Sequence, residues 1–161
     1  MTLYETDWYA WVQEQAVLLE QGRFDALDVD HLIEELNLMA GSTREQLYDR
    51  LIVLLAHLLK LEVAAKVLPG AHDRAQRGWR LTCAEQRRRL ARLLRRHPSL
   101  QPTMATEIPE AFAVARLQAL AALQVDEAYL PAECPWQTQQ VLESNFWPDE
   151  PKDIIDTFLR P

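Results

Sequence analysis

A run of leucines at helical spacing constrains the fold more than any other feature of this sequence. Between residues 47 and 61, apolar side chains recur every three or four positions and form one seam, made of Leu47, Leu51, Leu54, Leu58 and Leu61. This period is that of an amphipathic α-helix, not the alternation of a half-buried strand. The segment therefore predicts a long helix with one face in a hydrophobic core.

Helical periodicity extends over most of the chain. It predicts further helices at residues 7–20, 30–39, 74–96 and 106–123, with Pro109 in the first turn of the last, and a short helix after Thr138. We find no strand-like alternation and no internal repeat. The fold class we predict is all-α: a single-domain helical bundle of about five main helices over residues 1–148, with an irregular, aromatic-rich C-terminal segment. Residues 149–161 are predicted to be an extension with the pattern of a short amphipathic helix.

The sequence around Gly41 leaves one helix boundary open. Ser42 followed by Glu45 has the spacing of a capping box, which would start a new helix there. Without a break, residues 30–39 and the leucine seam would belong to one continuous helix. If the two helices are separate and antiparallel, Glu35 and Arg50 would lie close together and form an ion pair.

Composition excludes several kinds of protein. The chain has only four glycines in 161 residues and no glycine-rich phosphate-binding pattern. No apolar run is long enough to span a bilayer, and the N-terminus lacks the pattern of a secretory signal. Cys83 and Cys134 are far apart in sequence and are expected to be free thiols, as in a reducing compartment. We therefore expect a cytoplasmic protein without a membrane segment, and no cofactor.

Charge is unevenly distributed. Residues 1–40 carry nine acidic and one basic side chain, residues 74–100 nine arginines and one glutamate, and residues 101–161 ten acidic and three basic side chains. The net charges of these segments are −8, +8 and −7, and residues 41–73 are balanced. An acidic molecule with one basic helix is suited to electrostatic steering of a partner or to association between copies.

One histidine lies within the apolar run that contains the leucine seam. His57 lies on the flank of the seam, one heptad after Arg50, and histidine is the usual acid or base near neutral pH. It is either a structural residue with one or two hydrogen bonds or part of a functional site. A functional site would be a polar cluster that also includes Glu35, Arg50, Arg80 and Arg87. We favour the structural interpretation and assign no catalytic residue.

Cysteine and metal chemistry are less well supported. Cys83 has Arg80 and Arg87 nearby in sequence, and cations lower a thiol pKa, but its seam position indicates a buried apolar residue. The sequence contains Asp28-x-x-His31 and the reversed His31-x-x-Glu34, whereas a di-iron bundle needs two Glu-x-x-His motifs and two further glutamates. We therefore expect no metal site.

The arginines of residues 74–96 are the only basic cluster. Arg80 and Arg87 share one flank beside Cys83, which favours an inward or interfacial role for these two. The remaining arginines form a candidate basic surface that includes Arg77, Arg88, Arg92 and Arg95. Such a surface could contact nucleic acid through counterion release, but the other segments are acidic and would repel phosphate.

Five stretches, in this order, resemble a known bacterial family. They are "YETDWYAW", "QAVLLEQGRFDALD" leading into "HLIEEL", "RLIVLLAHLLKLE", "GWRLTCAEQRRRLARLL" followed by "HPSL", and "CPWQTQQVLESNFWP". Together they resemble domain of unknown function 29 over about residues 4–148. The chain departs from the family pattern at Leu61, where tryptophan is usual, and at Cys83, where isoleucine is usual. The resemblance implies an all-helical fold and no established activity, cofactor or partner.

These observations favour a bacterial cytoplasmic protein that is not an enzyme and that works by binding another protein or a second copy of itself. One alternative is a nucleic-acid-associated regulator that uses residues 74–96. The other is an enzyme whose polar site surrounds His57, Glu35, Arg50 and Arg80. The partner, the oligomeric state and the biological process stay open.

Overall fold

A computed structural model describes residues 1–67, 70 and 73–150, and every regular element in this part of the chain is a helix. The predicted all-α fold is confirmed. The structure divides into two compact units, Met1–Thr43 and Arg44–Pro161. Of the extension predicted for residues 149–161, residues 151–161 lie outside the described residues.

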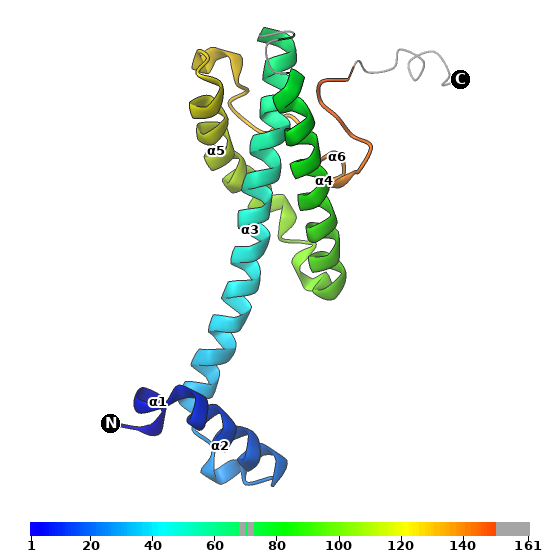
Figure 1. Cartoon of the computed structure of the whole chain (residues 1–161). Helices are drawn as coiled ribbons and strands as arrows, with labels where there is room; N and C mark the ends of the chain where they lie inside the picture. Colours follow the sequence, from blue (N-terminus) through cyan, green and yellow to red (C-terminus); the bar gives the residue numbers. More distant parts are fainter. Residues whose placement is uncertain (68–69, 71–72, 151–161) are drawn as a thin grey trace, which may run out of the picture. The chain divides into compact units, whose positions relative to one another are not determined.

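The N-terminal unit contains α1 (Leu3–Thr6), α2 (Trp8–Glu20), the short 3₁₀ helix η1 (Phe24–Ala26) and the first part of α3 (Val29–Val67) (Figure 1). Asp7 caps α2, because its carboxylate accepts a hydrogen bond of 3.0 Å from the amide of Ala10. Gly22 follows the end of α2 with a positive φ of 67°, a conformation that glycine adopts without strain. The bounds of α2 thus lie within one residue of the predicted 7–20.

The long helix α3 runs without interruption from Val29 to Val67 and passes through Gly41. Of the two alternatives that the sequence left open, the continuous helix is therefore the correct one, and the capping-box spacing of Ser42 and Glu45 does not start a new helix. Inside the helix the hydroxyl of Thr43 donates a 3.1 Å hydrogen bond to the carbonyl of Met39, one turn earlier. A hydroxyl satisfied in this way does not compete with the helix for backbone groups, and one glycine costs a helix only about 1 kcal/mol.

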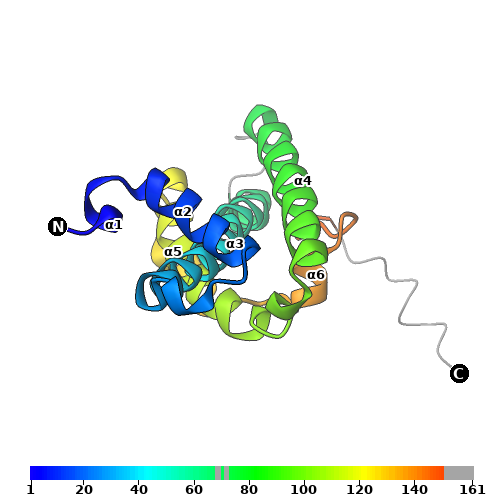
Figure 2. The same ribbon diagram turned by 90° about the horizontal axis from the view of Figure 1, so that it is seen from below.

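In the C-terminal unit, the second half of α3 lies between α4 (Asp73–Arg96) and α5 (Met104–Leu123) (Figures 1 and 2). Two 3₁₀ helices, η2 (Pro98–Leu100) and η3 (Glu127–Tyr129), and the short helix α6 (Thr138–Leu142) complete this unit. α5 begins before the predicted Thr106, so Pro109 lies in its second turn rather than its first.

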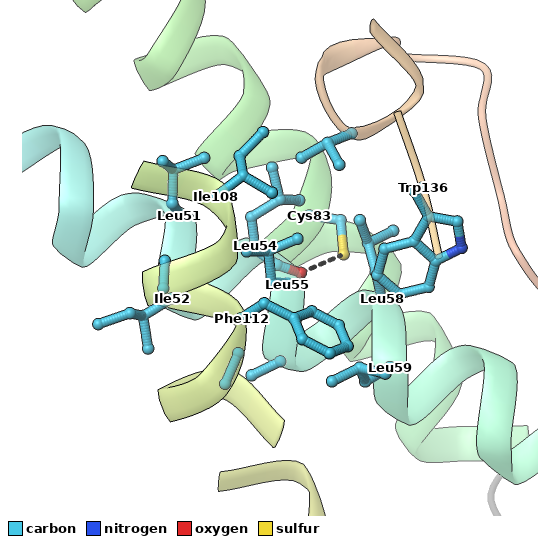
Figure 3. Packing of buried hydrophobic residues seen from close by; sticks show 14 of the residues in the cluster. Leu51, Ile52, Leu54, Leu55, Leu58, Leu59, Cys83, Ile108, Phe112 and Trp136 are labelled. Atoms are coloured by element: carbon cyan, nitrogen blue, oxygen red, sulfur yellow. Dashed lines mark hydrogen bonds between the residues drawn. The ribbon is translucent and has the colours of Figure 1, made fainter. Parts of the chain in front are cut away.

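The leucine seam forms the centre of the core. The side chains of Leu47, Leu51, Leu54, Leu58 and Leu61 have no exposed surface. Phe112 of α5 and Trp136 of the C-terminal segment pack edge to face beside them, with ring centres 6.3 Å apart (Figure 3). Each buried leucine contributes roughly 1.5–3 kcal/mol, so this seam is a large part of what stabilises the C-terminal unit.

Candidate functional site

The predicted ion pair between Glu35 and Arg50 does not form. Both residues lie on the continuous helix α3, fifteen positions apart, which is about 22 Å along a helix axis. Glu35 instead accepts a 2.9 Å hydrogen bond from the hydroxyl of Tyr4. The pairing was wrong because it depended on a turn at Gly41.

His57 is half-buried and bonded to its own helix. Its Nδ1 lies 2.8 Å from the carbonyl oxygen of Val53. Because a carbonyl can only accept, Nδ1 must donate the proton of this hydrogen bond. Burial holds the pKa of His57 below its ordinary value, an effect that the bond to Val53 partly offsets. The ring is therefore neutral at physiological pH, and this geometry is that of a structural histidine.

Arg80 and Arg87 of α4 hold the C-terminal segment against the bundle. Arg87 is buried and donates 2.9 Å hydrogen bonds through Nε to the carbonyl of Val141 and through Nη2 to that of Phe146. Arg80 donates to the carboxylates of Asp149 at 2.7 Å and Glu150 at 3.1 Å.

Both guanidinium groups also contact one aromatic ring. Their central carbons lie 4.6 Å (Arg80) and 5.0 Å (Arg87) from the ring centre of Trp147. Cation–π contacts of this kind stabilise desolvated arginines. We name Arg80, Arg87 and Trp147 the arginine clamp. Both clamp arginines are thus occupied within their own chain.

No hydrogen bond or ion pair among the described residues joins two of the five candidate side chains, which are Glu35, Arg50, His57, Arg80 and Arg87. The structure therefore does not bring these side chains together as one polar cluster.

The thiol of Cys83, between the clamp arginines, is poorly placed to act as a nucleophile. It is fully buried, its sulfur lies 4.0 Å from the carbonyl oxygen of Leu54 (Figure 3), and burial raises its pKa to about 12. The hydrogen bonds of His57, Arg80, Arg87 and Cys83 thus lie within the packing of α3, α4 and the C-terminal segment.

The other arginines of α4 point to solvent. The exposed members of this basic surface are Arg74, Arg77, Arg88, Arg89, Arg92, Arg95 and Arg96. Glu85 forms ion pairs with Arg88 and Arg89 and neutralises part of the surface. The division into inward and outward arginines follows the helical period of α4, in which Arg80 and Arg87 share a face with Cys83.

A polar and aromatic cluster in the N-terminal unit was missed by our sequence reasoning. The carboxylate of Asp28 accepts 3.1 Å and 2.8 Å hydrogen bonds from Nε1 of Trp11 and Nδ1 of His31. The rings of Tyr4 and His31 are stacked with centres 3.9 Å apart, and the hydroxyl of Tyr4 reaches Glu35. Residues from α1, α2 and α3 thus meet in one group, which we name the Asp28–His31 cluster.

Hydrogen bonds dominate the electrostatics of this cluster. The bond to Asp28 raises the pKa of His31 and lowers that of Asp28, and the bond to Glu35 raises the pKa of Tyr4 to about 12. The Asp28-x-x-His31 spacing was the available signal, because it places both side chains on one side at the start of α3, where they pair. No group of three potential metal ligands occurs among the described residues. The cluster joins α1 and α2 to α3.

The N-terminal unit leaves most of its apolar side chains in solvent. It buries only Trp11, Gln15 and Leu18. Of the fifteen large apolar side chains that are exposed in the described residues, twelve belong to this unit. Monomeric proteins rarely expose extended apolar surface unless it binds something. The unit is also acidic, with nine acidic side chains and one basic one.

The fold and these contacts define an all-helical protein with an exposed apolar and acidic N-terminal surface and a basic outer face on α4. The model of the family described as "Domain of unknown function DUF29" matches residues 3–147, and the chain belongs to this family. No curated protein and no solved structure matches the chain. None of the described helices is both long and apolar enough to cross a membrane.

Proposed function

We propose that this protein is a non-enzymatic protein–protein interaction module that binds a basic partner through its N-terminal unit. The observation that carries the proposal is the exposed apolar surface of that unit, which its own helices do not cover. Its chemistry suits a helix or segment that offers apolar side chains together with lysine or arginine.

The outer side of α2 is the best-defined part of this surface. Trp8, Tyr9, Val12, Ala16 and Leu19 lie within about 100° of one another at 100° per residue. All of them except the half-buried Val12 are exposed. We name these five residues the α2 surface. The exposed rings of Trp8 and Tyr9 lie in an acidic unit. Such a surface favours arginine side chains of a partner, because a guanidinium stacks on aromatic rings and pairs with carboxylates.

We also propose that the protein acts in the bacterial cytoplasm. Two free thiols, the buried Cys83 and the half-buried Cys134, suit a reducing compartment. Cell fractionation of the native host, with antibody detection of the protein, tests this location.

Affinity capture from the native host tests the interaction. We expect wild-type protein to recover one partner at a stoichiometric level and the double variant Trp8→Ser/Leu19→Ser to lose it. Because both side chains are exposed, the variant should keep the helical circular dichroism of the wild type. Binding should weaken as salt rises, since the unit has a net charge of −8.

A matched control comes from the C-terminal unit. Leu81 and Leu117 are exposed leucines outside the α2 surface, so Leu81→Ser/Leu117→Ser should leave capture unchanged. If wild type and both double variants recover the same proteins, the α2 surface is not the binding site. Recovery of no stoichiometric partner by wild type would count against the proposed function as a whole.

Nucleic-acid binding is the second candidate, because seven arginines of α4 are exposed. The outward arginines satisfy the electrostatic requirement for phosphate contact. The acidic N-terminal unit and the Glu85 ion pairs oppose it, so we rank it below protein binding.

A further inference from the structure

A second exposed apolar surface lies on α3. Val29, Ile33, Leu36 and Ala40 recur at intervals of four, three and four residues, so they share a face within about 60° at 100° per residue. The three larger side chains are 51%, 53% and 63% exposed, and Ala40 is exposed as well. We name these four residues the α3 stripe.

The helices of the N-terminal unit pack elsewhere on α3. Their hydrogen bonds reach Asp28 and Glu35, and the ring of Tyr4 stacks on His31. These three residues lie about 110–170° around the helix from the centre of the α3 stripe. The same three–four spacing continues along α3 to the leucine seam, where it is buried. The stripe thus has the pattern of a coiled-coil seam, but no helix among the described residues covers it as the leucine seam is covered.

Polar residues on one flank of the stripe indicate what covers it. Asp30, Asn37 and Arg44 are seven residues apart, so they lie on one side of the helix in the order acid, amide, base. A second α3 in antiparallel orientation reverses this order. Asp30 then lies opposite Arg44 of the second copy and Asn37 opposite its own equivalent, and twofold symmetry repeats each pair. In a parallel pair the same flank would face Leu32 and Met39, and its charges would have no partner.

The register that these charges select places Leu36 against Ala40 of the second copy, so that a large side chain meets a small one in each of the two central layers. Ile33 then lies opposite Thr43, and the contact ends before Leu47, which is buried in its own chain. The opposite flank contains Met39, which is 66% exposed and would meet its own equivalent. Arg44 already pairs with Glu107 of its own chain, but its side chain is 59% exposed and can donate to a second carboxylate.

We propose that the α3 stripe is the contact surface of an antiparallel homodimer of this protein. A pair of helices about four turns long buries less than a standard interface of about 1,600 Å². The dimer should therefore be weak, with a dissociation constant on the order of 1–100 µM. The surface differs from the α2 surface proposed for a basic partner, so either interaction can occur without the other.

Analytical ultracentrifugation of the full chain from about 1 to 500 µM tests the dimer. We expect concentration-dependent dimerisation of wild type and a dissociation constant at least about tenfold higher for Leu36→Ser. Leu38→Ser is the matched control, because Leu38 is 59% exposed on the same helix but lies about 170° away from the stripe. It should dimerise like wild type. A wild type that is monomeric throughout, or equal dimerisation by Leu36→Ser, would overturn the proposal.

Charge exchange tests the orientation. Asp30→Arg and Arg44→Asp should each dimerise less than wild type, because each homodimer contains two like-charge pairs. An equimolar mixture of the two variants should form a heterodimer, in which both pairs become opposite in charge. If the mixture associates no more than the separate variants, the antiparallel arrangement is wrong. The Trp8→Ser/Leu19→Ser variant should still dimerise, which separates failure of this proposal from failure of the partner-binding function.

Discussion

Arg87 shows how the surroundings of a charged side chain define its role. The sequence places it among nine arginines of similar local context, but only this one is buried and bonded to two backbone carbonyls. A buried cation is tolerated only when it is paired and hydrogen-bonded. The carbonyls of Val141 and Phe146 satisfy Nε and Nη2 and the ring of Trp147 contacts the cation, whereas Nη1 is buried without a hydrogen-bond partner among the described residues. Arg87 is therefore a structural residue that meets this requirement in part.

Replacement of Arg87 by methionine should destabilise the protein. The change leaves the carbonyl oxygens of Val141 and Phe146 without their donors, and each unsatisfied buried group costs about 1–3 kcal/mol. We expect the free energy of unfolding, measured by urea denaturation, to fall by about 3 kcal/mol. Arg88→Met is the control, because Arg88 is exposed and pairs with Glu85 at the surface. This substitution should change the free energy of unfolding by less than about 1 kcal/mol. Equal effects of the two changes would contradict the role of the clamp.

His31 should make the N-terminal unit sensitive to pH. Its pKa is raised above 6.5 by Asp28, so its contribution to stability is complete below pH 6.5 and is lost as pH rises through the raised pKa. The pKa of Asp28 is lowered from 3.8, so its contribution is lost as pH falls through that lowered value. The cluster is therefore most stabilising between about pH 4 and 6.5.

Hydrogen exchange of the amides of α1 and α2, corrected for intrinsic rates, measures this effect. We expect protection to decrease from about pH 6 to about pH 8.5 in wild type and to depend less on pH in His31→Gln. The neighbouring charges Asp30 and Glu34 also raise the pKa of His31 and remain in the variant. An unchanged pH dependence in His31→Gln would show that another group is responsible.

Among the helices, α3 shows most clearly what local signals leave open. Gly41, Ser42 and Glu45 together indicate a helix start, yet the helix continues through them. Helix formers surround this short stretch, and the segment of α3 that follows it buries the leucine seam in the C-terminal unit. Packing of the rest of a helix routinely outweighs a weak local preference.

A glycine substitution tests this continuity. A Cβ atom added at Gly41 would meet nothing within 4 Å, and Gly41 has a helical conformation. Gly41→Ala should therefore raise the free energy of unfolding by about 0.5–1 kcal/mol in urea denaturation. Gly22 is the contrasting site, because its φ of +67° strains any other residue; Gly22→Ala should be destabilising. Loss of stability in Gly41→Ala would indicate a break in α3.

For the whole molecule, the important property is the separation of its charges. A segment of net charge −8 and a helix region of net charge +8 belong to one chain. Fields of opposite sign steer partners and orient copies, and they weaken with salt. The same distribution predicts a limited interaction with nucleic acid.

Fluorescence anisotropy with labelled DNA and RNA tests that interaction. We expect weak binding at about 50 mM salt that disappears at about 150 mM, because few phosphates can be neutralised. Arg88→Glu/Arg92→Glu/Arg95→Glu should remove the low-salt binding, since all three residues are exposed. Arg87 is unsuitable for charge reversal because it is buried. Strong binding at about 150 mM salt, lost in the triple variant, would instead favour the nucleic-acid alternative.

Much of the fold follows from the sequence because helical periodicity is a local property. The spacing of the leucines identifies both the all-α class and the buried face of α3, and Asp7 and Gly22 mark the ends of α2. The positions of the exposed arginines of α4 follow from the same period. These features depend on neighbours three or four residues away, so one sequence suffices to derive them.

Only the tertiary structure decided which polar side chains meet. It separated Glu35 from Arg50, bonded His57 to a backbone carbonyl, and brought Tyr4 onto His31 across twenty-seven residues of sequence. Such contacts depend on how segments that are distant in sequence pack together, and local periodicity does not encode which of these segments meet. For the same reason, the exposure of the α2 surface and the α3 stripe became visible only in three dimensions, although each is an ordinary apolar helix face in the sequence.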